Sequence, residues 1–165
     1  MTKYDVSTSN SLYERAKAVI PGGINGHYGF SVKKNGPKYF SRSEGSRFWD
    51  VDNNEFIDYM CAYGPMILGY NHPAVDEAAL KQLKAGNTVS LASPVMVELA
   101  ETLVDMVTAV DWALFSKNGG DGTSLAALVA RAATGRQKLV KVAEGYHGVA
   151  AWMQDGRAGT IPADS

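Results

Sequence analysis

A glycine-rich turn ahead of a helix-like segment is the feature of this sequence with the clearest chemical potential. It reads Ser116-Lys117-Asn118-Gly119-Gly120-Asp121-Gly122-Thr123. Glycines let a backbone approach an anion closely, and the start of a helix offers unpaired N–H groups and a partial positive charge. The amides of Gly119, Gly120 and Asp121 are therefore candidates for holding a phosphate. The Asp121 carboxylate would repel an anion, so we expect it to cap the helix or to point away.

Hydroxyl groups from Thr123 or Ser124 could add a further donor to such a site. The turn differs from two common nucleotide-binding patterns. No Gly-Lys-Ser/Thr follows it, as the Walker pattern requires, and glycines at positions 119, 120 and 122 do not give the dinucleotide spacing G-x-G-x-x-G. Taken alone, the turn fits an ordinary structural role equally well.

A second group of candidates, Tyr146 and His147, follows an apolar segment at residues 138–142. Another apolar segment, residues 113–115, precedes the glycine turn, and a small-residue helix is predicted at 123–133. This order implies a right-handed parallel βαβ unit. Ligands bind beyond the carboxyl ends of such strands, so both groups should meet there. A flat phosphorylated ring would need an anion pocket and an aromatic face. The alternative for His147 is a loop histidine with a local hydrogen bond.

The first part of the chain predicts a helix followed by a small antiparallel meander. Apolar spacing indicates a helix over residues 11–20, capped by Ser9, Asn10 or Ser11 and ended by Pro21-Gly22-Gly23. Residue type and turn signals predict three short strands, the last two as a hairpin, at residues 39–43, 47–51 and 55–59.

The second part predicts mostly helices. They are expected over residues 73–84 and from Pro94 to about Val107, the latter with Ser93 as its N-cap. Gly135 should end the helix that follows the glycine turn. The fold class is therefore α/β, with a helix-and-meander segment at residues 1–70 and the start of a larger domain at residues 71–165.

Composition excludes several classes of protein. The 165 residues include 16 basic and 17 acidic side chains, with no basic block, which argues against nucleic acid or an anionic membrane as the main partner. No apolar run approaches the roughly 20 residues needed to span a bilayer, and no targeting signal is visible. The one cysteine, Cys61, is expected to be a small buried thiol in a reducing cytoplasm, with no metal cluster near it.

Six stretches carry a resemblance to one family, in one order over nearly the whole chain. They are Ser11 to Asn25, Glu44 to Tyr59, Gly64-Pro65-Met66-Ile67-Leu68-Gly69-Tyr70-Asn71-His72-Pro73, Asn118 to Thr123, Thr134-Gly135-Arg136 and Tyr146-His147-Gly148. Together they resemble the class III aminotransferases and the glutamate-1-semialdehyde 2,1-aminomutase group.

The resemblance implies a fold type I enzyme that binds pyridoxal 5'-phosphate (PLP) and acts as a homodimer on a small amino or keto substrate. In such enzymes the PLP ring is an electron sink and a lysine moves a proton. The resemblance places the PLP phosphate at Gly119, Gly120 and Asp121, and the ring against Tyr146 with His147 beside it. Tyr63 matches an aromatic position that borders the substrate pocket.

Three departures from the family pattern shape the expected function. The family's chains are more than twice as long, and no lysine here matches the Schiff-base lysine, so we expect an N-terminal portion that is inactive alone. The common turn Asn-Ser-Gly-Thr-Glu-Ala is replaced by residues 118–123, so phosphate binding should rest more on backbone N–H groups. The aminomutases carry an arginine for the substrate carboxylate, and residues 22–30 contain none. His27 and Tyr28 in that segment suggest a less acidic substrate, and the equally weighted alternative is that this loop only packs against the protein.

Three hypotheses follow for the function. The first is PLP-dependent amino-group transfer by an aminotransferase or aminomutase. The second is a non-catalytic ligand-binding fragment, because the Schiff-base lysine is absent. The third is a nucleotide-binding domain that uses the same turn, and the lack of an acidic residue completing a dinucleotide fingerprint argues against it.

Overall fold

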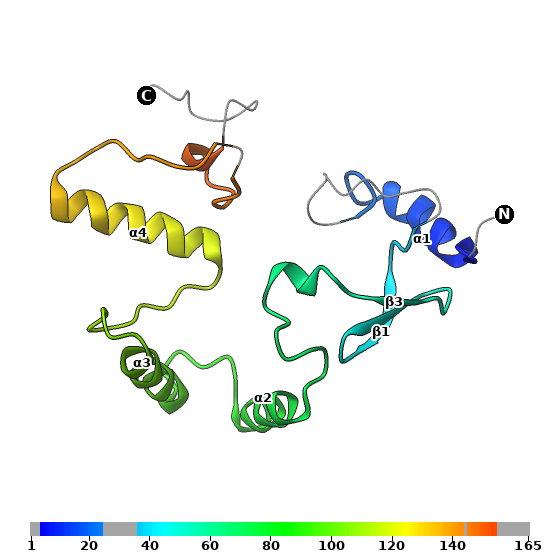
Figure 1. The fold of residues 1–165 in the computed structure, drawn as a ribbon, viewed down its shortest axis with the longest axis horizontal. Coiled ribbons are helices and arrows are strands. Elements are labelled where there is room, and N and C mark those ends of the chain that lie inside the picture. Colours follow the sequence, from blue (N-terminus) through cyan, green and yellow to red (C-terminus); the bar gives the residue numbers. More distant parts are fainter. Residues whose placement is uncertain (1–3, 25–35, 144, 155–165) are drawn as a thin grey trace. The chain divides into compact units, whose positions relative to one another are not determined.

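The structure is a computed structural model that describes residues 4–24, 36–143 and 145–154 (Figure 1). The candidates His27 and Tyr28 lie outside the described residues. The chain divides into two compact units, Met1–Val89 and Ser90–Ser165. The domain boundary between residues 70 and 71 that the sequence suggests stays a prediction.

The first unit opens with helix α1, Ser7–Lys17, which begins four residues before the predicted start. The backbone amides of Thr8 and Ser9 donate to the two carboxylate oxygens of Asp52, at 2.7 and 2.9 Å. The predicted local caps are therefore wrong. Two carboxylates accept from the first amides instead, because the Ser7 amide also donates to Asp5 Oδ1 at 2.9 Å. The residues expected as caps, Ser9, Asn10 and Ser11, lie inside the helix.

An antiparallel meander follows, as predicted. Its strands are β1 (Phe40–Glu44), β2 (Arg47–Asp50) and β3 (Glu55–Ile57), in the order β1-β2-β3. Phe48 on β2 pairs with Phe56 on β3, and their rings stack with centroids 5.2 Å apart. The fully buried Asp50 accepts hydrogen bonds from the amides of Asp52 and Asn54, which closes the turn between β2 and β3.

Helix α2 completes the first unit and runs from Pro73 to Ala85, close to the predicted range. It begins with proline at its first turn, where the missing N–H has no intrahelical partner to lose. Between the meander and α2 lies a short 3₁₀ turn, η1, at Cys61–Tyr63, followed by an irregular segment that the glycine and proline content predicted.

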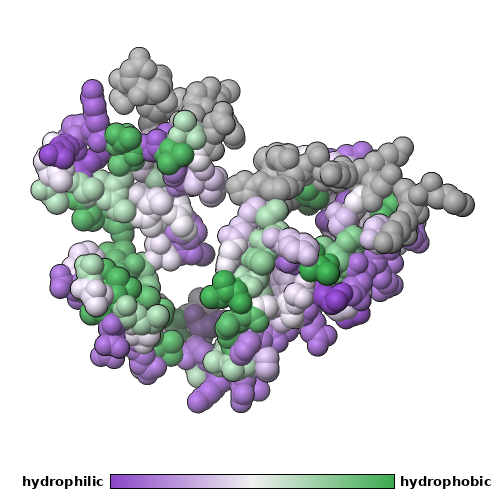
Figure 2. Space-filling model, in the orientation of Figure 1, coloured by the Kyte–Doolittle hydropathy of each residue, from purple (hydrophilic) through white to green (hydrophobic). Residues whose placement is uncertain are grey.

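The second unit contains α3 (Pro94–Met106), α4 (Gly119–Thr134) and a 3₁₀ turn, η2 (Ala151–Met153). Helix α3 starts after Ser93, as predicted. Hydrophobic side chains of α3 are exposed, and Figure 2 shows them as green surface on this helix; they are Val95, Met96, Val97, Leu99, Leu103 and Met106. No helix in the described residues is long and apolar enough to cross a bilayer.

Two sequence predictions fail in this unit. Residues 119–123 of the glycine turn are part of helix α4, and we call them its first turn. The strands predicted at 113–115 and 138–142 do not form within the described residues. A strand is held by hydrogen bonds to a neighbouring strand, and the described part of this unit supplies none, so Val140 stays 96 % exposed. The predicted parallel sheet is therefore not present in the described part of the chain.

Candidate functional site

The N-terminus of α4 is built by a reciprocal cap. Asn118 occupies the N-cap position, and its side-chain oxygen accepts a hydrogen bond from the Asp121 amide at 2.9 Å. Its Nδ2 donates to an Asp121 carboxylate oxygen at 2.8 Å. The Asp121 carboxylate thus belongs to the cap, as the sequence suggested. The Asp121 N–H, which we expected to face an anion, donates to Asn118 instead.

The amides of Gly119 and Gly120 have no hydrogen-bond acceptor among the described residues. They occupy the first two positions of α4, where helix geometry leaves the N–H groups unpaired and the helix dipole favours an anion. A Cβ atom added at Gly119 would meet nothing within 4 Å, so space is open beside this amide. Two free donors at the start of a 16-residue helix can hold one phosphate.

The loop that carries Tyr146 and His147 lies against this first turn. The Thr123 hydroxyl oxygen is 2.9 Å from the backbone oxygen of His147. A Cβ atom added at Gly148 would lie 2.9 Å from the Cα atom of Gly120, so the two backbones are in close contact. The two groups of candidates therefore converge, although the strands expected to bring them together do not form in the described residues.

The side chains of the loop differ in their surroundings. The Nε2 atom of His147 lies 3.2 Å from the backbone oxygen of Val142, which is the local hydrogen bond that the alternative interpretation predicts. Tyr146 is 67 % exposed, so its ring is accessible to a ligand. The Thr123 hydroxyl, a candidate phosphate donor from the sequence, is directed to backbone carbonyls instead.

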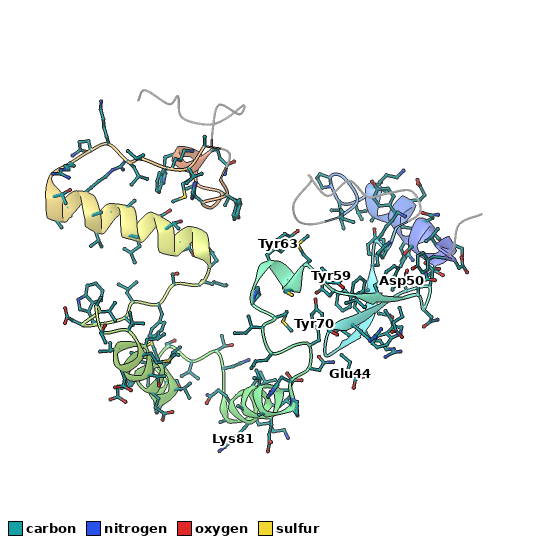
Figure 3. The ribbon with its side chains drawn as sticks, viewed as in Figure 1. Glu44, Asp50, Tyr59, Tyr63, Tyr70 and Lys81 are labelled. Atoms are coloured by element: carbon teal, nitrogen blue, oxygen red, sulfur yellow. The ribbon has the colours of Figure 1, made fainter. Side chains whose placement is uncertain are left out.

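Tyr63, the candidate on the substrate side, belongs to the first unit and lies on η1 (Figure 3). Residues Cys61, Ala62 and Tyr63 all have left-handed backbone angles, with φ of 49°, 48° and 67°. Such angles cost non-glycine residues roughly 1–2 kcal/mol each. The turn leaves Tyr63 62 % exposed. It also exposes Cys61, so the prediction of a buried thiol is wrong.

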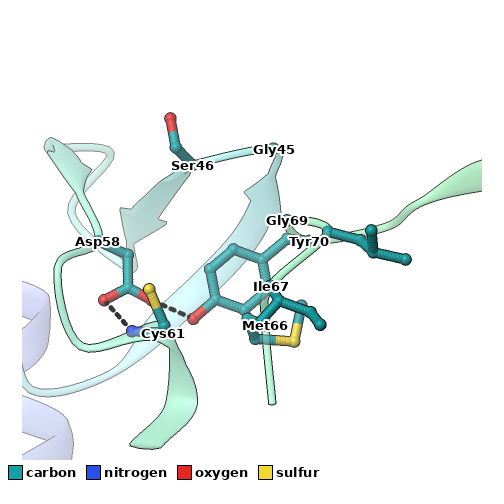
Figure 4. Close-up of a pocket in the computed structure, with 9 residues that line it drawn as sticks. Gly45, Ser46, Asp58, Cys61, Met66, Ile67, Gly69 and Tyr70 are labelled. Carbon is teal, nitrogen blue, oxygen red and sulfur yellow. Dashed lines mark hydrogen bonds between the residues drawn. The ribbon is translucent and has the colours of Figure 1, made fainter. Parts of the chain in front are cut away.

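A pocket of about 300 Å³ lies beside η1 (Figure 4). Its lining combines backbone from the β1–β2 turn with side chains of the segment before α2: Gly45, Ser46, Asp58, Cys61, Met66, Ile67, Leu68, Gly69 and Tyr70. Asp58 and Tyr70 lie in two of the family-like stretches, but the sequence analysis gave neither a role; they are 12 residues apart and meet through the fold.

Asp58 and Tyr70 form the polar contact of this pocket. The Tyr70 hydroxyl donates to Asp58 Oδ2 at 2.5 Å, and Asp58 Oδ1 accepts from the amides of Met60 and Cys61. The hydrogen bond from Tyr70 lowers the pKa of Asp58, although burial acts in the opposite sense. The same bond, with burial, raises the pKa of Tyr70 to about 12.

Comparison with known proteins defines the class of this chain. The sequence profile of the class-III aminotransferases matches residues 31–153. The chain belongs to the class-III aminotransferase family. Members of this family use PLP.

Particular relatives refine this assignment. The chain is 45 % identical to the aminopentol aminotransferase of Sphingopyxis macrogoltabida, over 93 % of this chain and 36 % of that protein. It is 39 % identical to the glutamate-1-semialdehyde 2,1-aminomutase of Fusobacterium nucleatum, over 85 % and 33 % respectively. The structure superposes on the PLP internal aldimine form of the FumI protein of Sphingopyxis sp. MTA144 with a TM-score of 0.87 and 44 % identity, covering 94 % of this chain and 38 % of that one. The chain thus spans about a third of the length of these relatives.

Proposed function

We propose that this chain supplies the phosphate- and ring-binding part of a PLP-dependent aminotransferase whose complete chain is longer than these 165 residues. The observation that carries the proposal is the convergence, within the second unit, of the start of α4 with the loop that bears Tyr146. Membership of the class-III family supports it.

The residues at this point fit PLP. The amides of Gly119 and Gly120, with the dipole of α4, would hold the anionic phosphate. Tyr146 would lie against the ring, with His147 beside it. PLP, when bound, supplies an electron sink for reactions at the substrate's amino-bearing carbon. Tyr63, with His27 and Tyr28, would contact the substrate.

The same proposal has consequences for the sheet, the reactive lysine and the oligomeric state of the complete enzyme. In the complete enzyme, residues 113–115 and 138–142 would form strands of a parallel sheet with partner strands from other parts of the protein. The reactive lysine would also lie outside this sequence. We propose a homodimer, which the resemblance to the family supports, and a cytoplasmic location, which the single cysteine favours. The mass of the purified protein in solution tests the dimer.

We propose that the substrate is an amine with little negative charge, and that its amino group is transferred to a second molecule. Two observations favour it over glutamate semialdehyde. Identity to the aminopentol aminotransferase is 45 %, against 39 % for the aminomutase. Residues 22–30 contain no arginine that could pair with a substrate carboxylate. The complete gene product should therefore transfer the amino group of an aminopentol to a keto acid faster than it isomerises glutamate semialdehyde. A faster isomerisation would overturn the substrate assignment.

The binding claim is tested by removing one N–H group without disturbing the helix. Proline is favoured at the first helical position, and Asn118 already has the extended angles (φ −147°, ψ 168°) that proline requires before it. Gly119→Pro should weaken PLP binding to the complete gene product about tenfold, the value of one hydrogen bond to a charged group. Gly119→Ala keeps the N–H and meets open space, so it is the matched control. Equal affinities of the two variants would refute phosphate binding by this amide.

A further inference from the structure

We propose that Thr123 is a positioning residue that holds the loop 145–149 against the first turn of α4, and so sets where Tyr146 stands relative to the anion-binding amides. The expected effect on PLP binding rests on the proposed function. The contacts between Thr123 and the loop do not depend on that proposal. We call the contact set of Thr123, His147, Gly148 and Met153 the Thr123 clamp.

The Thr123 hydroxyl is the only side-chain donor of the first turn of α4 that reaches the loop within the described residues. Gly119, Gly120 and Gly122 carry no side chain, and the Asp121 carboxylate accepts from the Asn118 side chain. Any side-chain bond from this turn to the loop must therefore come from Thr123.

The hydroxyl has one proton and several acceptors in reach. Its oxygen lies 2.9 Å from the His147 carbonyl oxygen, 3.0 Å from that of Gly119 and 3.1 Å from that of Gly120. The Gly119 carbonyl can already accept a helical N–H at i+4. Among the described residues, the His147 carbonyl receives a hydrogen bond from Thr123 alone. Removing the hydroxyl would therefore take away the hydrogen bond of the His147 carbonyl, whereas the Gly119 carbonyl would keep its helical partner.

Close packing completes the clamp. Gly148 has φ +121°, and a Cβ atom there would meet Gly120 Cα at 2.9 Å and Met153 Sδ at 3.2 Å. Met153 is only 4 % exposed, and its sulfur lies 3.5 Å from the Thr123 hydroxyl. The Gln154 side chain donates to the Gly148 carbonyl at 2.6 Å. The loop is thus fixed immediately after Tyr146, so the clamp determines the point from which the Tyr146 ring extends.

The test compares Thr123→Val with Thr123→Ser in the complete gene product. Valine keeps the branched shape but removes the hydroxyl, whereas serine keeps the hydroxyl. We expect Thr123→Val to weaken PLP binding about fivefold, the value of one neutral hydrogen bond. Binding of inorganic phosphate, which has no ring, should be unchanged. Amide hydrogen exchange should accelerate in residues 145–149 and not in the body of α4. Thr123→Ser should restore both properties.

Other outcomes decide between the clamp and the proposed function. If Thr123→Val weakens phosphate and PLP equally, or accelerates exchange throughout α4, the residue is merely structural and the positioning role is wrong. If exchange in residues 145–149 does not change, the clamp does not exist. If the wild-type protein binds no PLP while the exchange effect is present, the clamp stands and the proposed function fails. Gly148→Ala, which forces the two backbones apart from the loop side, should reproduce the exchange effect.

Discussion

At the scale of single residues, the hydrogen bond between Tyr70 and Asp58 gives the first unit a defined dependence on pH. The pKa of Asp58 is lowered below its ordinary 3.8, so the bond stabilises the fold above that pH and is lost as the pH falls through the lowered value. The pKa of Tyr70 is raised from 10.0 to about 12, so its contribution is full below pH 10 and is lost as the pH rises through about 12.

Tyr70→Phe removes this bond and should lower the urea midpoint of the complete gene product at neutral pH. The difference from wild type should be largest between about pH 5 and pH 9 and should shrink toward both extremes, because one partner then changes its charge in the wild-type protein. Tyr59→Phe is the control, since Tyr59 is 89 % exposed. A difference that stays constant from acid to alkali would contradict the role of the pair.

A second residue-scale prediction concerns the start of α1. Asp52→Ala removes both acceptors of the Thr8 and Ser9 amides and should destabilise this helix by about 1 kcal/mol, as loss of an N-cap does. Ser11→Ala, at a position that the sequence pattern favours as the cap, should leave the helix unchanged. Hydrogen exchange of the amides in α1 measures both variants. A larger effect of Ser11→Ala than of Asp52→Ala would indicate that Ser11 caps the helix after all.

At the scale of elements, periodicity and turn chemistry predicted the meander, α2 and α3 because each depends on nearby residues. Two outcomes depended on distant residues and were not predicted. Asp52 accepts from the amides of Thr8 and Ser9 at the start of α1. Residues 138–142 find no partner strand in the described part of the chain. The left-handed angles at Cys61–Tyr63 had no signal in residue type, because none of these residues favours them.

The candidate site was predicted in outline for a related reason. Glycines at a helix start and an aromatic loop after the next segment are local patterns, and the structure brings them together. The capping role of the Asp121 carboxylate was also partly foreseen. The direction of the Thr123 hydroxyl was not, because the nearest carbonyl, that of His147, lies 24 residues along the chain.

The C-terminus of α4 provides a prediction that isolates backbone conformation. Gly135 has φ 68° and Gly119 has a helical backbone, yet a Cβ atom at either position meets nothing within 4 Å. Gly135→Ala should therefore cost about 1 kcal/mol of stability through its left-handed angle alone. Gly119→Ala should be neutral or stabilising, since alanine loses less entropy in a helix. Urea unfolding of the two variants compares them; an equal loss at both would argue against the left-handed cap.

At the scale of the whole molecule, family membership and the geometry of the second unit are both consistent with the PLP site proposed above. The profile match covers residues 31–153 and so includes both the first turn of α4 and the loop with Tyr146. Class-III aminotransferases use PLP, and the second unit offers an exposed Tyr146 and two amides that have no acceptor in the part of the chain that the structure describes. A phosphate alone would need only the amides, whereas an aromatic residue on a loop that contacts the same turn is compatible with the flat phosphorylated ligand proposed above.

The most direct measurement is a crystal structure of the complete gene product grown with PLP. The phosphate should accept hydrogen bonds from the amides of Gly119 and Gly120, and the pyridine ring should lie in contact with Tyr146. A phosphate bound at another place in the protein, or a ring out of reach of Tyr146, would contradict the proposed site.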